Sequence, residues 1–191
     1  MSRVRLIAGV WGGQYLESPR GADLRPTSER LRESLFSSLA PELAGARFAD
    51  LFAGTGAVGL EALSRGAALA ALVERNPRCV QAIRASVAKL GAQPEAVVVA
   101  GAVERVWARV AAEHGPFDVV FVDPPYSYRE WRRLLERLLA PGGGLHAEGL
   151  LVAQHPRAQP LEAPGEPFRI RDFGESRLSW FRPAAEQEGA G

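Results

Sequence analysis

Cysteine and lysine are almost absent from this chain of 191 residues, which contains one of each, Cys79 and Lys89. A single cysteine excludes an internal disulfide and any metal site built from several thiolates. No apolar run approaches the roughly 20 residues that are needed to cross a bilayer. Residues 1–9 also lack the long apolar stretch of a secretory signal. We therefore expect a cytoplasmic protein without a membrane partner.

The net charge is only +1, so the composition does not indicate a protein that coats nucleic acid nonspecifically. Of the 23 basic residues, all but Lys89 are arginine, whose planar guanidinium suits phosphate contacts and base stacking. A GC-rich coding sequence explains the same bias and carries more weight. Arginines cluster within residues 1–33 and again within 129–137. The second cluster is equally well interpreted as a phosphate-tracking surface or as an ordinary solvated helix face.

Short apolar runs alternate with amphipathic segments between residues 47 and 154, and this alternation predicts a mostly parallel sheet with helices on both faces. Strands are predicted here at residues 48–52, 69–74, 96–100, 118–122 and 149–154. Helices are predicted between them. One begins at Asn76-Pro77 and ends at Gly91, because the asparagine can cap it and the glycine stops it. The predicted class is an α/β, Rossmann-like fold.

Both ends of the chain are predicted to form hairpins. The first pairs residues 3–8 with 14–16, and the second pairs 168–173 with 177–182, which brings the predicted sheet to seven strands. A helix follows Thr27, the expected N-cap. We expect one domain over residues 1–183, with an N-terminal hairpin extension (1–22), a Rossmann-like core (23–183) and a disordered tail (184–191).

A glycine-rich turn follows the first predicted strand of the core. The run from Asp50 to Gly59 reads Asp-Leu-Phe-Ala-Gly-Thr-Gly-Ala-Val-Gly, and its glycines let a ligand approach the main chain closely. Glu74 ends the second strand 20 residues after Gly54, where its carboxylate can accept both hydroxyl protons of a ribose. The turn and the carboxylate together predict a site for a nucleoside cofactor.

Two cofactors fit this pattern. The spacing G-x-G-x-x-G from Gly54 to Gly59, followed by Glu74, is typical of dehydrogenases that bind NAD. Asp50 stands just before the glycines, however, and a carboxylate suits a cationic sulfonium better than a pyrophosphate. The chain also offers no recognisable pair of residues for hydride transfer. These features favour S-adenosylmethionine, and a NAD-binding oxidoreductase is the alternative.

The fourth predicted strand ends in Asp123-Pro124-Pro125-Tyr126. In an open parallel sheet this corner belongs to the same crevice as the glycine turn. The prolines leave carbonyl oxygens free for a ligand, Asp123 adds acceptors, and Tyr126 offers a face for stacking. Acceptors that take both protons of an exocyclic amine favour a nitrogen whose lone pair points at an electrophile. The corner therefore predicts methyl transfer to a base amine, a reaction in which positioning dominates and no metal is needed.

These motifs resemble the class I methyltransferases that carry a D/N-P-P-Y/F box. Over residues 3–182 the chain is more closely similar to the bacterial family that methylates guanine N2 in 16S ribosomal RNA. The likeness is carried by residues 5–9, 24–33, 52–56, 59–66, 121–126 and 173–174. The arginine-rich segment 24–33 is specific to that family, whereas the other segments occur in many methyltransferases.

The resemblance implies a role for each matching position. S-adenosylmethionine would be held by Asp50, Phe52, Ala53, Gly54, Thr55, Gly56, Glu74, Arg75 and Ala102. The flipped base would meet the catalytic positions Asp123, Pro124, Pro125 and Tyr126. RNA would be contacted by Arg3, Arg5, Arg25, Thr27, Arg30 and Arg32. The implied reaction methylates the exocyclic N2 of a specific guanine in 16S ribosomal RNA, within an assembled or assembling small ribosomal subunit.

Two departures from the family alter these expectations. After the third strand the chain has Gly101 where the family has Asn or Asp, so recognition of adenine falls to the Ala102 amide. The first hairpin has Gly12, Gln14 and Tyr15 where basic residues are common, which shifts the expected RNA contacts toward arginines nearby.

Other functions are less consistent with the chain. A DNA amino-methyltransferase normally carries an added recognition region, for which 191 residues leave little room. A protein glutamine methyltransferase usually has Asn before Pro-Pro and an extra substrate domain. A non-catalytic RNA-binding module of the same fold would not need the intact corner at residues 123–126.

Overall fold

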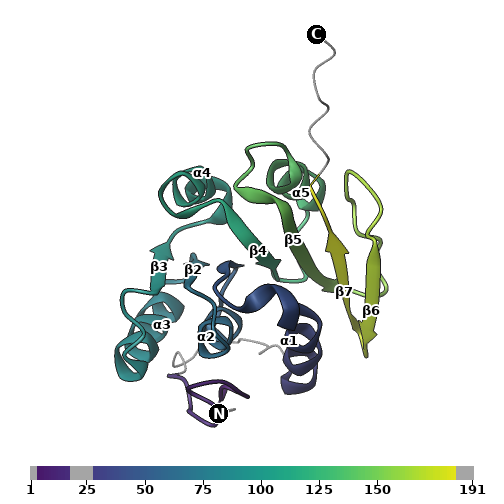
Figure 1. Ribbon diagram of the computed structural model, residues 1–191. Helices are drawn as coiled ribbons and strands as arrows, with labels where there is room; N and C mark the ends of the chain where they lie inside the picture. The colour runs from purple at the N-terminus through teal and green to yellow at the C-terminus, as the bar shows by residue number, and fades with distance from the viewer. Residues whose placement is uncertain (1–3, 18–27, 184–191) are drawn as a thin grey trace.

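The apolar runs predicted as strands pair into one sheet in the computed structural model, which describes residues 4–17 and 28–183 (Figure 1). The sheet has seven strands in the order β3-β2-β1-β4-β5-β7-β6. They are β1 (Arg47–Leu51), β2 (Leu69–Glu74), β3 (Ala96–Ala100), β4 (Phe117–Val122), β5 (Leu145–Pro156), β6 (Arg169–Phe173) and β7 (Ser176–Phe181). β1 to β5 pair in parallel, and β7 is antiparallel to both β5 and β6. The predicted seven-stranded, mostly parallel fold is confirmed, although β5 begins earlier than residue 149.

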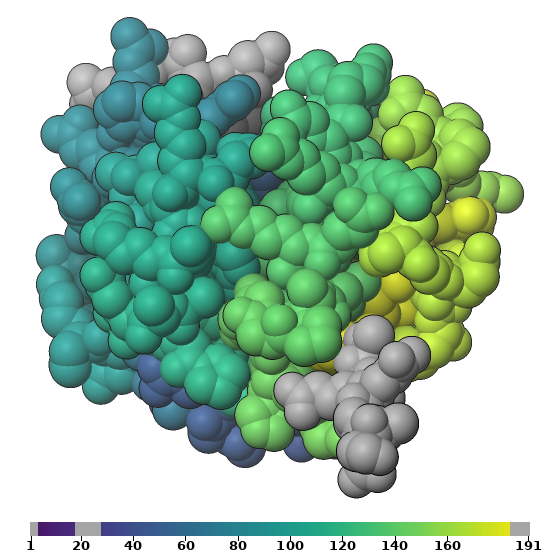
Figure 2. Space-filling view, turned by 90° about the horizontal axis from the view of Figure 1, so that it is seen from above, coloured from purple at the N-terminus to yellow at the C-terminus, as the bar shows by residue number. Residues whose placement is uncertain are grey.

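Helices cover both faces of this sheet, as predicted. They are α1 (Glu29–Leu43), α2 (Ala57–Ser64), α3 (Pro77–Leu90), α4 (Val103–His114) and α5 (Trp131–Leu139). α1, α2 and α3 lie on one face, and α4 and α5 lie on the other (Figure 1). Seen from above, α4 and α5 lie side by side and the β6–β7 hairpin flanks α5 (Figure 2).

Each helical face encloses its own hydrophobic cluster. Residues of α1, α2 and α3 pack on one side of the sheet around Leu72 and Phe121. On the other side, Trp107 of α4 packs on Phe117, and its indole N–H donates to the Gly143 carbonyl at 2.7 Å. Successive side chains of each strand point to opposite faces of the sheet and so contribute to both clusters. Because both faces are buried, the strands are nearly continuous apolar runs in the sequence.

Residues 4–17 form a hairpin-like segment that is fixed to α2. Arg5 bridges Tyr15 in antiparallel fashion, and backbone bonds join Leu6 to residues 13 and 14. The Glu61 carboxylate of α2 accepts the amides of residues 7 and 8, at 2.7 and 3.0 Å. Gly9 has a φ of +82°, and a Cβ there would lie 1.7 Å from the Ser64 carbonyl oxygen. The close approach of this segment to α2 therefore requires glycine at residue 9.

One predicted helix start is wrong. The side chain of Ser28, not of Thr27, caps α1, because Ser28 has extended backbone angles and its hydroxyl accepts the Leu31 amide at 3.3 Å. Thr27 lies outside the described residues, as do Arg3, Arg20, Arg25 and the predicted tail at 184–191. Among the residues that are described, none of the helices combines the length and the apolar character needed to span a membrane.

Candidate active site

The carboxyl ends of β1, β2, β4 and β5 open into a cleft of about 660 Å³. Its lining comes mainly from the glycine turn after β1, the end of β2, the Asp-Pro-Pro-Tyr corner after β4 and the tip of the β6–β7 hairpin, with further residues from the start of α1 and from β5. Its lining includes Gly54, Glu74, Asp123, Tyr126, Gln154 and Glu175. The glycine turn and the proline corner thus share one cleft, as the sequence predicts.

Backbone angles that favour glycine shape the turn after β1. Gly54 and Gly56 have φ values of +57° and +76°, and a Cβ on Gly56 would come within 3.1 Å of Leu72 and Ile83. Phe52 also has a positive φ, +69°, which no other non-glycine residue among the described ones adopts. A bulky side chain is strained there, so the surrounding packing holds this turn in one shape.

Glu74 has a carboxylate whose position is fixed from two sides. Oε2 accepts the Gly54 amide at 2.8 Å, and Oε1 accepts the Asn76 amide at 2.7 Å. The residue is 9% exposed and lines the cleft. Each oxygen has lone-pair capacity beyond these bonds, so the carboxylate can accept further hydroxyl protons from a ligand without rearranging.

Asp50 lies beneath the turn and not in the lining of the cleft. Its Oδ2 accepts the Gly59 amide of α2 at 2.8 Å, and the residue is 2% exposed. Burial raises the pKa of Asp50 to about 7, against the effect of the Gly59 bond and with smaller contributions from Asp123 and Glu74. A contact between Asp50 and a cofactor stays a prediction.

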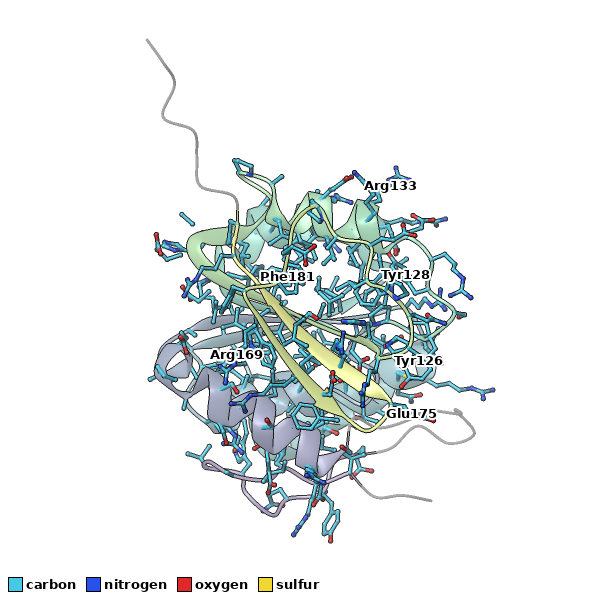
Figure 3. All side chains as sticks on the ribbon, turned by 90° about the vertical axis from the view of Figure 1, so that its right-hand side faces the viewer. Tyr126, Tyr128, Arg133, Arg169, Glu175 and Phe181 are labelled. Atoms are coloured by element: carbon cyan, nitrogen blue, oxygen red, sulfur yellow. The ribbon has the colours of Figure 1, made fainter. Side chains whose placement is uncertain are left out.

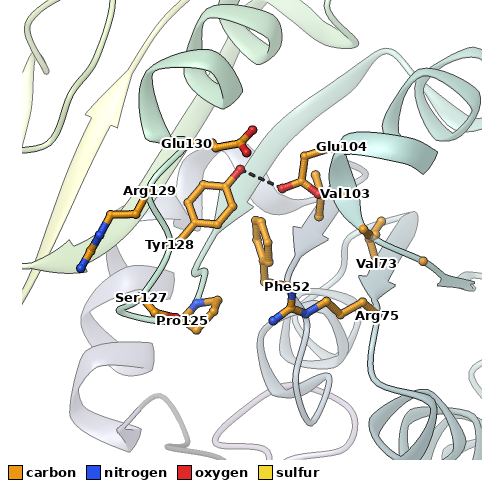
Figure 4. Close-up of a pocket in the computed structure, with 12 residues that line it drawn as sticks. Phe52, Val73, Arg75, Val103, Glu104, Pro125, Ser127, Tyr128, Arg129 and Glu130 are labelled. Carbon is orange, nitrogen blue, oxygen red and sulfur yellow. Dashed lines mark hydrogen bonds between the residues drawn. The ribbon is translucent and has the colours of Figure 1, made fainter.

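A second cavity of about 340 Å³ adjoins the cleft, because Phe52, Arg75 and Pro125 line both (Figure 4). The rings of Phe52 and Tyr128 meet edge to face with centroids 5.3 Å apart. The Tyr128 hydroxyl donates to Glu104 at 2.8 Å. Burial and this carboxylate both raise the pKa of Tyr128, which keeps the hydroxyl protonated as a donor. The cavity that these aromatic residues line offers a face on which a flat purine ring can stack.

Backbone groups complete the second cavity. Ala102, a predicted cofactor residue, lies in its wall beside Gly101. Gly101 has a φ of +152°, and a Cβ there would meet a Val106 methyl group at 2.5 Å. Glycine is therefore required where the related family has Asn or Asp. The close packing of α4 at residue 101 thus accounts for the glycine at this position.

The proline corner faces the tip of the β6–β7 hairpin. Tyr126 is 39% exposed, and its hydroxyl lies 3.2 Å from Oγ of Ser176. Figure 3 shows Tyr126 and Glu175 at the same edge of the molecule. Arg177 joins the two strands of the hairpin through two bonds of 2.7 and 3.1 Å to Asp172. The corner and the hairpin tip therefore form one side of the cleft.

The residues predicted to contact RNA fall into three groups. Arg3, Arg25 and Thr27 lie outside the described residues. Arg5 and Arg30 are exposed, and Arg5 pairs with Glu29 at 3.1 Å. Arg32 is only 1% exposed: its guanidinium donates to the Arg5 carbonyl at 3.0 Å and lies 3.6 Å from Glu61. A buried guanidinium cannot reach a phosphate, so the prediction for Arg32 is wrong.

Several residues of the site were missed from the sequence. The β6–β7 tip enters the cleft only because β7 folds back antiparallel beside β5, which no local pattern encodes. Tyr128 had a signal, since it follows the proline corner by two residues and is aromatic. Gln154 also had one, because it ends the apolar run 150–153 of a strand whose carboxyl end faces the cleft.

A glycine turn, a buried carboxylate at the end of β2 and a proline corner, which meet over a mostly parallel sheet, are the features of those class I methyltransferases that carry a D/N-P-P-Y/F box. The chain belongs to the family described as Conserved hypothetical protein 95, which matches residues 4–182.

Individual relatives are similar over most of the chain. It is 41% identical to "Ribosomal RNA small subunit methyltransferase D" of Escherichia coli K12, over 80% of this chain and 74% of that protein. The protein of the same name from Haemophilus influenzae is 30% identical, over 84% and 83% of the two chains. A solved structure of a hypothetical protein from Thermus thermophilus superposes with a TM-score of 0.79 at 38% identity, over 94% of this chain and 99% of that one.

Proposed function

We propose that this protein is an S-adenosylmethionine-dependent methyltransferase that methylates the exocyclic N2 of a specific guanine in 16S ribosomal RNA. The observation that carries the proposal is the single cleft lined by both the glycine turn and the Asp123–Tyr126 corner. The names of the relatives from Escherichia coli and Haemophilus influenzae support ribosomal RNA of the small subunit as the substrate. The reaction takes place in the cytoplasm, on an assembled or assembling subunit.

The residues of the two cavities fit such a cofactor. The carboxylate of Glu74, fixed by the Gly54 and Asn76 amides, would accept the ribose hydroxyls. The cavity that Phe52 and Tyr128 line together would hold the adenine ring against an aromatic face, and the Ala102 amide in its wall would be available to a ring nitrogen. Ala53, Gly54 and Thr55 line the part of the cleft that would receive the methionine portion, and the positive φ of Gly56 shapes the same turn. When bound, S-adenosylmethionine supplies a methyl group already activated by the sulfonium charge, so the reaction needs no metal.

The target base lies on the other side of the same cleft. Tyr126 stacks on the ring, and the Asp123 carboxylate accepts a hydrogen bond from the exocyclic amine. This hydrogen bond draws the nitrogen lone pair out of conjugation and orients it toward the cofactor side, which is a matter of positioning and electrostatics. Once the amine has gained the methyl group, it loses one proton, which Asp123 or water accepts.

Asp123→Ala tests this assignment directly. We expect the variant to lose at least about 100-fold in the rate of transfer of labelled methyl groups to unmodified small subunits, because the proton acceptor is gone. Its affinity for S-adenosylhomocysteine should stay within a few-fold of the original. The matched control is Asp118→Ala at the opposite end of β4, where the carboxylate accepts the Arg47 amide. Wild-type activity in Asp123→Ala would contradict the role.

The substrate is tested in a strain that lacks the gene. Mass spectrometry of its 16S ribosomal RNA should show the loss of one N2-methylguanine, which the intact gene restores and the Asp123→Ala gene does not. Retention of every N2-methylguanine would overturn the choice of substrate. It would leave open DNA or another RNA as the methyl acceptor.

A further inference from the structure

The cleft contains a buried amide, Gln154, to which the proposed mechanism assigns no role. Gln154 lies near the carboxyl end of β5 and lines the cleft together with Asp123 and Tyr126. Its role rests on the proposed function, because it concerns the base that occupies this part of the cleft.

The pairing of β4 with β5 brings Gln154 next to Asp123. The two strands are parallel and in register as far as Val122 and Ala153, so the next position on each strand is Asp123 and Gln154. Phe121 and Val152 both belong to the hydrophobic cluster on the α1 side of the sheet. Because side chains alternate along a strand, Asp123 and Gln154, two residues further on, project from that same side.

The amide of Gln154 is incompletely hydrogen-bonded. The residue is 7% exposed, and its Oε1 accepts no hydrogen bond from any residue that the structure describes. Buried side-chain polar atoms are paired in the large majority of cases, since an unpaired one loses its hydration without compensation. Rotation about the last side-chain torsion can present either amide atom to a ligand.

The position of Gln154 in the sheet indicates which of the two ligands it contacts. The segments that fit the cofactor follow β1, β2 and β3, on one side of β4. Gln154 is on the other side, between the proline corner and β7, and it pairs with Leu178. Tyr126 and Ser176, whose hydroxyls lie 3.2 Å apart, line this part of the cleft. The amide therefore faces the space for the base and not the space for the nucleoside of the cofactor.

We infer that Gln154 is a specificity-determining residue that hydrogen-bonds the Watson–Crick edge of the target base beside Asp123. Guanine presents the N1–H donor and the O6 acceptor next to its N2 amine. A glutamine amide complements this edge with whichever of its atoms faces the base. A base with the same amine but without these two groups leaves the amide unpaired, and sites that bond a substrate group discriminate strongly against analogues that lack it.

The test compares guanine with 2-aminopurine, which has the same amine but neither N1–H nor O6. Small subunits are reconstituted with 16S RNA that carries one base or the other at the position identified by mass spectrometry. Wild-type protein should prefer guanine by at least about tenfold in kcat/KM. Gln154→Met keeps the side-chain volume and removes both polar atoms. It should lower the guanine rate about tenfold and bring the ratio of the two substrates close to one.

Three controls separate recognition from folding. Gln154→Leu is made in parallel, and the thermal midpoint and the affinity for S-adenosylhomocysteine are measured for each variant. Gln81→Met changes an exposed glutamine of α3 and should preserve the substrate ratio. The inference is overturned if Gln154→Met keeps the wild-type ratio, lowers both rates equally or weakens cofactor binding. If the wild-type protein methylates neither substrate, the proposed function itself fails, whatever Gln154 does.

Discussion

At the scale of the residue, the carboxylates of Asp50, Glu74 and Asp123 lie around the glycine turn, and the pKa of Asp50 is raised in part by the other two. Glu74 is held by two amides, and Asp123 and Glu74 both contribute to the raised pKa of Asp50. Asp50 is the most deeply buried of them, and the bond from the Gly59 amide favours its charged form less than burial disfavours it. The folded protein therefore prefers Asp50 in its protonated state over a range of pH in which the unfolded chain has already lost that proton.

The contribution of Asp50 to the stability of the folded protein should consequently fall as the pH rises toward 7. Asp50 has a pKa of about 7 when folded, against an ordinary value of 3.8. Between these values the folded state binds more protons, so its free energy of unfolding decreases with pH by at most about 1.4 kcal/mol per unit. Asp50→Asn keeps an acceptor for the Gly59 amide but does not titrate.

Urea unfolding of both proteins at about pH 5, 6, 7 and 8, without ligand, measures this effect. We expect Asp50→Asn to gain stability relative to wild type as the pH rises from about 5 to 7, and the difference to level off above the folded pKa. Parallel profiles over the whole range would show that Asp50 keeps a normal pKa in the folded state.

At the scale of the element, Glu61 joins three segments of the chain. Its carboxylate accepts the amides of residues 7 and 8, pairs with Arg65 at 2.7 Å and lies 3.6 Å from the buried Arg32. α1, α2 and the N-terminal hairpin-like segment thus share one buried charged group. Arg32 belongs to this junction and neutralises a carboxylate that has no exposed surface.

Removal of that carboxylate should be far more costly than removal of a surface charge. Glu61→Ala leaves Arg32 buried without its partner and two backbone amides without an acceptor, a loss of about 3–5 kcal/mol. Glu29→Ala on the same side of α1 breaks only the exposed pair with Arg5 and should change stability little. Chemical denaturation of both variants measures the contrast. Equal stability of the two would show that the junction does not depend on Glu61.

The same elements show how far sequence reasoning reaches. The strands β1 to β4 were predicted within a residue or two, because buried parallel strands read as uninterrupted apolar runs. The burial of Arg32 was missed, although its spacing from Phe36 and Leu39 places it on the apolar side of α1. The charge of Arg32 suggested that its side chain lies on the surface. Its burial depends on the tertiary contact with Glu61, which the sequence does not reveal. The hairpin at the end of the chain was predicted, but the position of its tip (residues 173–176) in the cleft was missed because that position depends on the strand order.

At the scale of the whole molecule, the cleft divides the sheet into two functional parts. The ends of the parallel strands β1 to β3 and the segments after them provide the glycine turn, Glu74, and the Phe52 and Ala102 parts of the second cavity. β4, β5 and the β6–β7 hairpin provide Asp123, Tyr126 and Gln154. Phe52 and Pro125 lie at the boundary and line both cavities. A ligand of the first part therefore contacts segments on both sides of β1 and stabilises the folded domain as a unit.

The charges that line the cleft predict whether S-adenosylhomocysteine or NAD stabilises the protein. S-adenosylhomocysteine at about 100 times its dissociation constant should add about 2.7 kcal/mol to the free energy of unfolding. For a domain of this size that corresponds to a rise of about 5–10 °C in the thermal midpoint. NAD carries a pyrophosphate, which the carboxylates of Glu74 and Asp123 in the cleft would repel, so the same concentration of NAD should leave the midpoint unchanged. Differential scanning fluorimetry measures both ligands. A shift with NAD and none with S-adenosylhomocysteine would identify the G-x-G-x-x-G turn as a dehydrogenase site, because only the cofactor's charge distinguishes the two uses of the same fold.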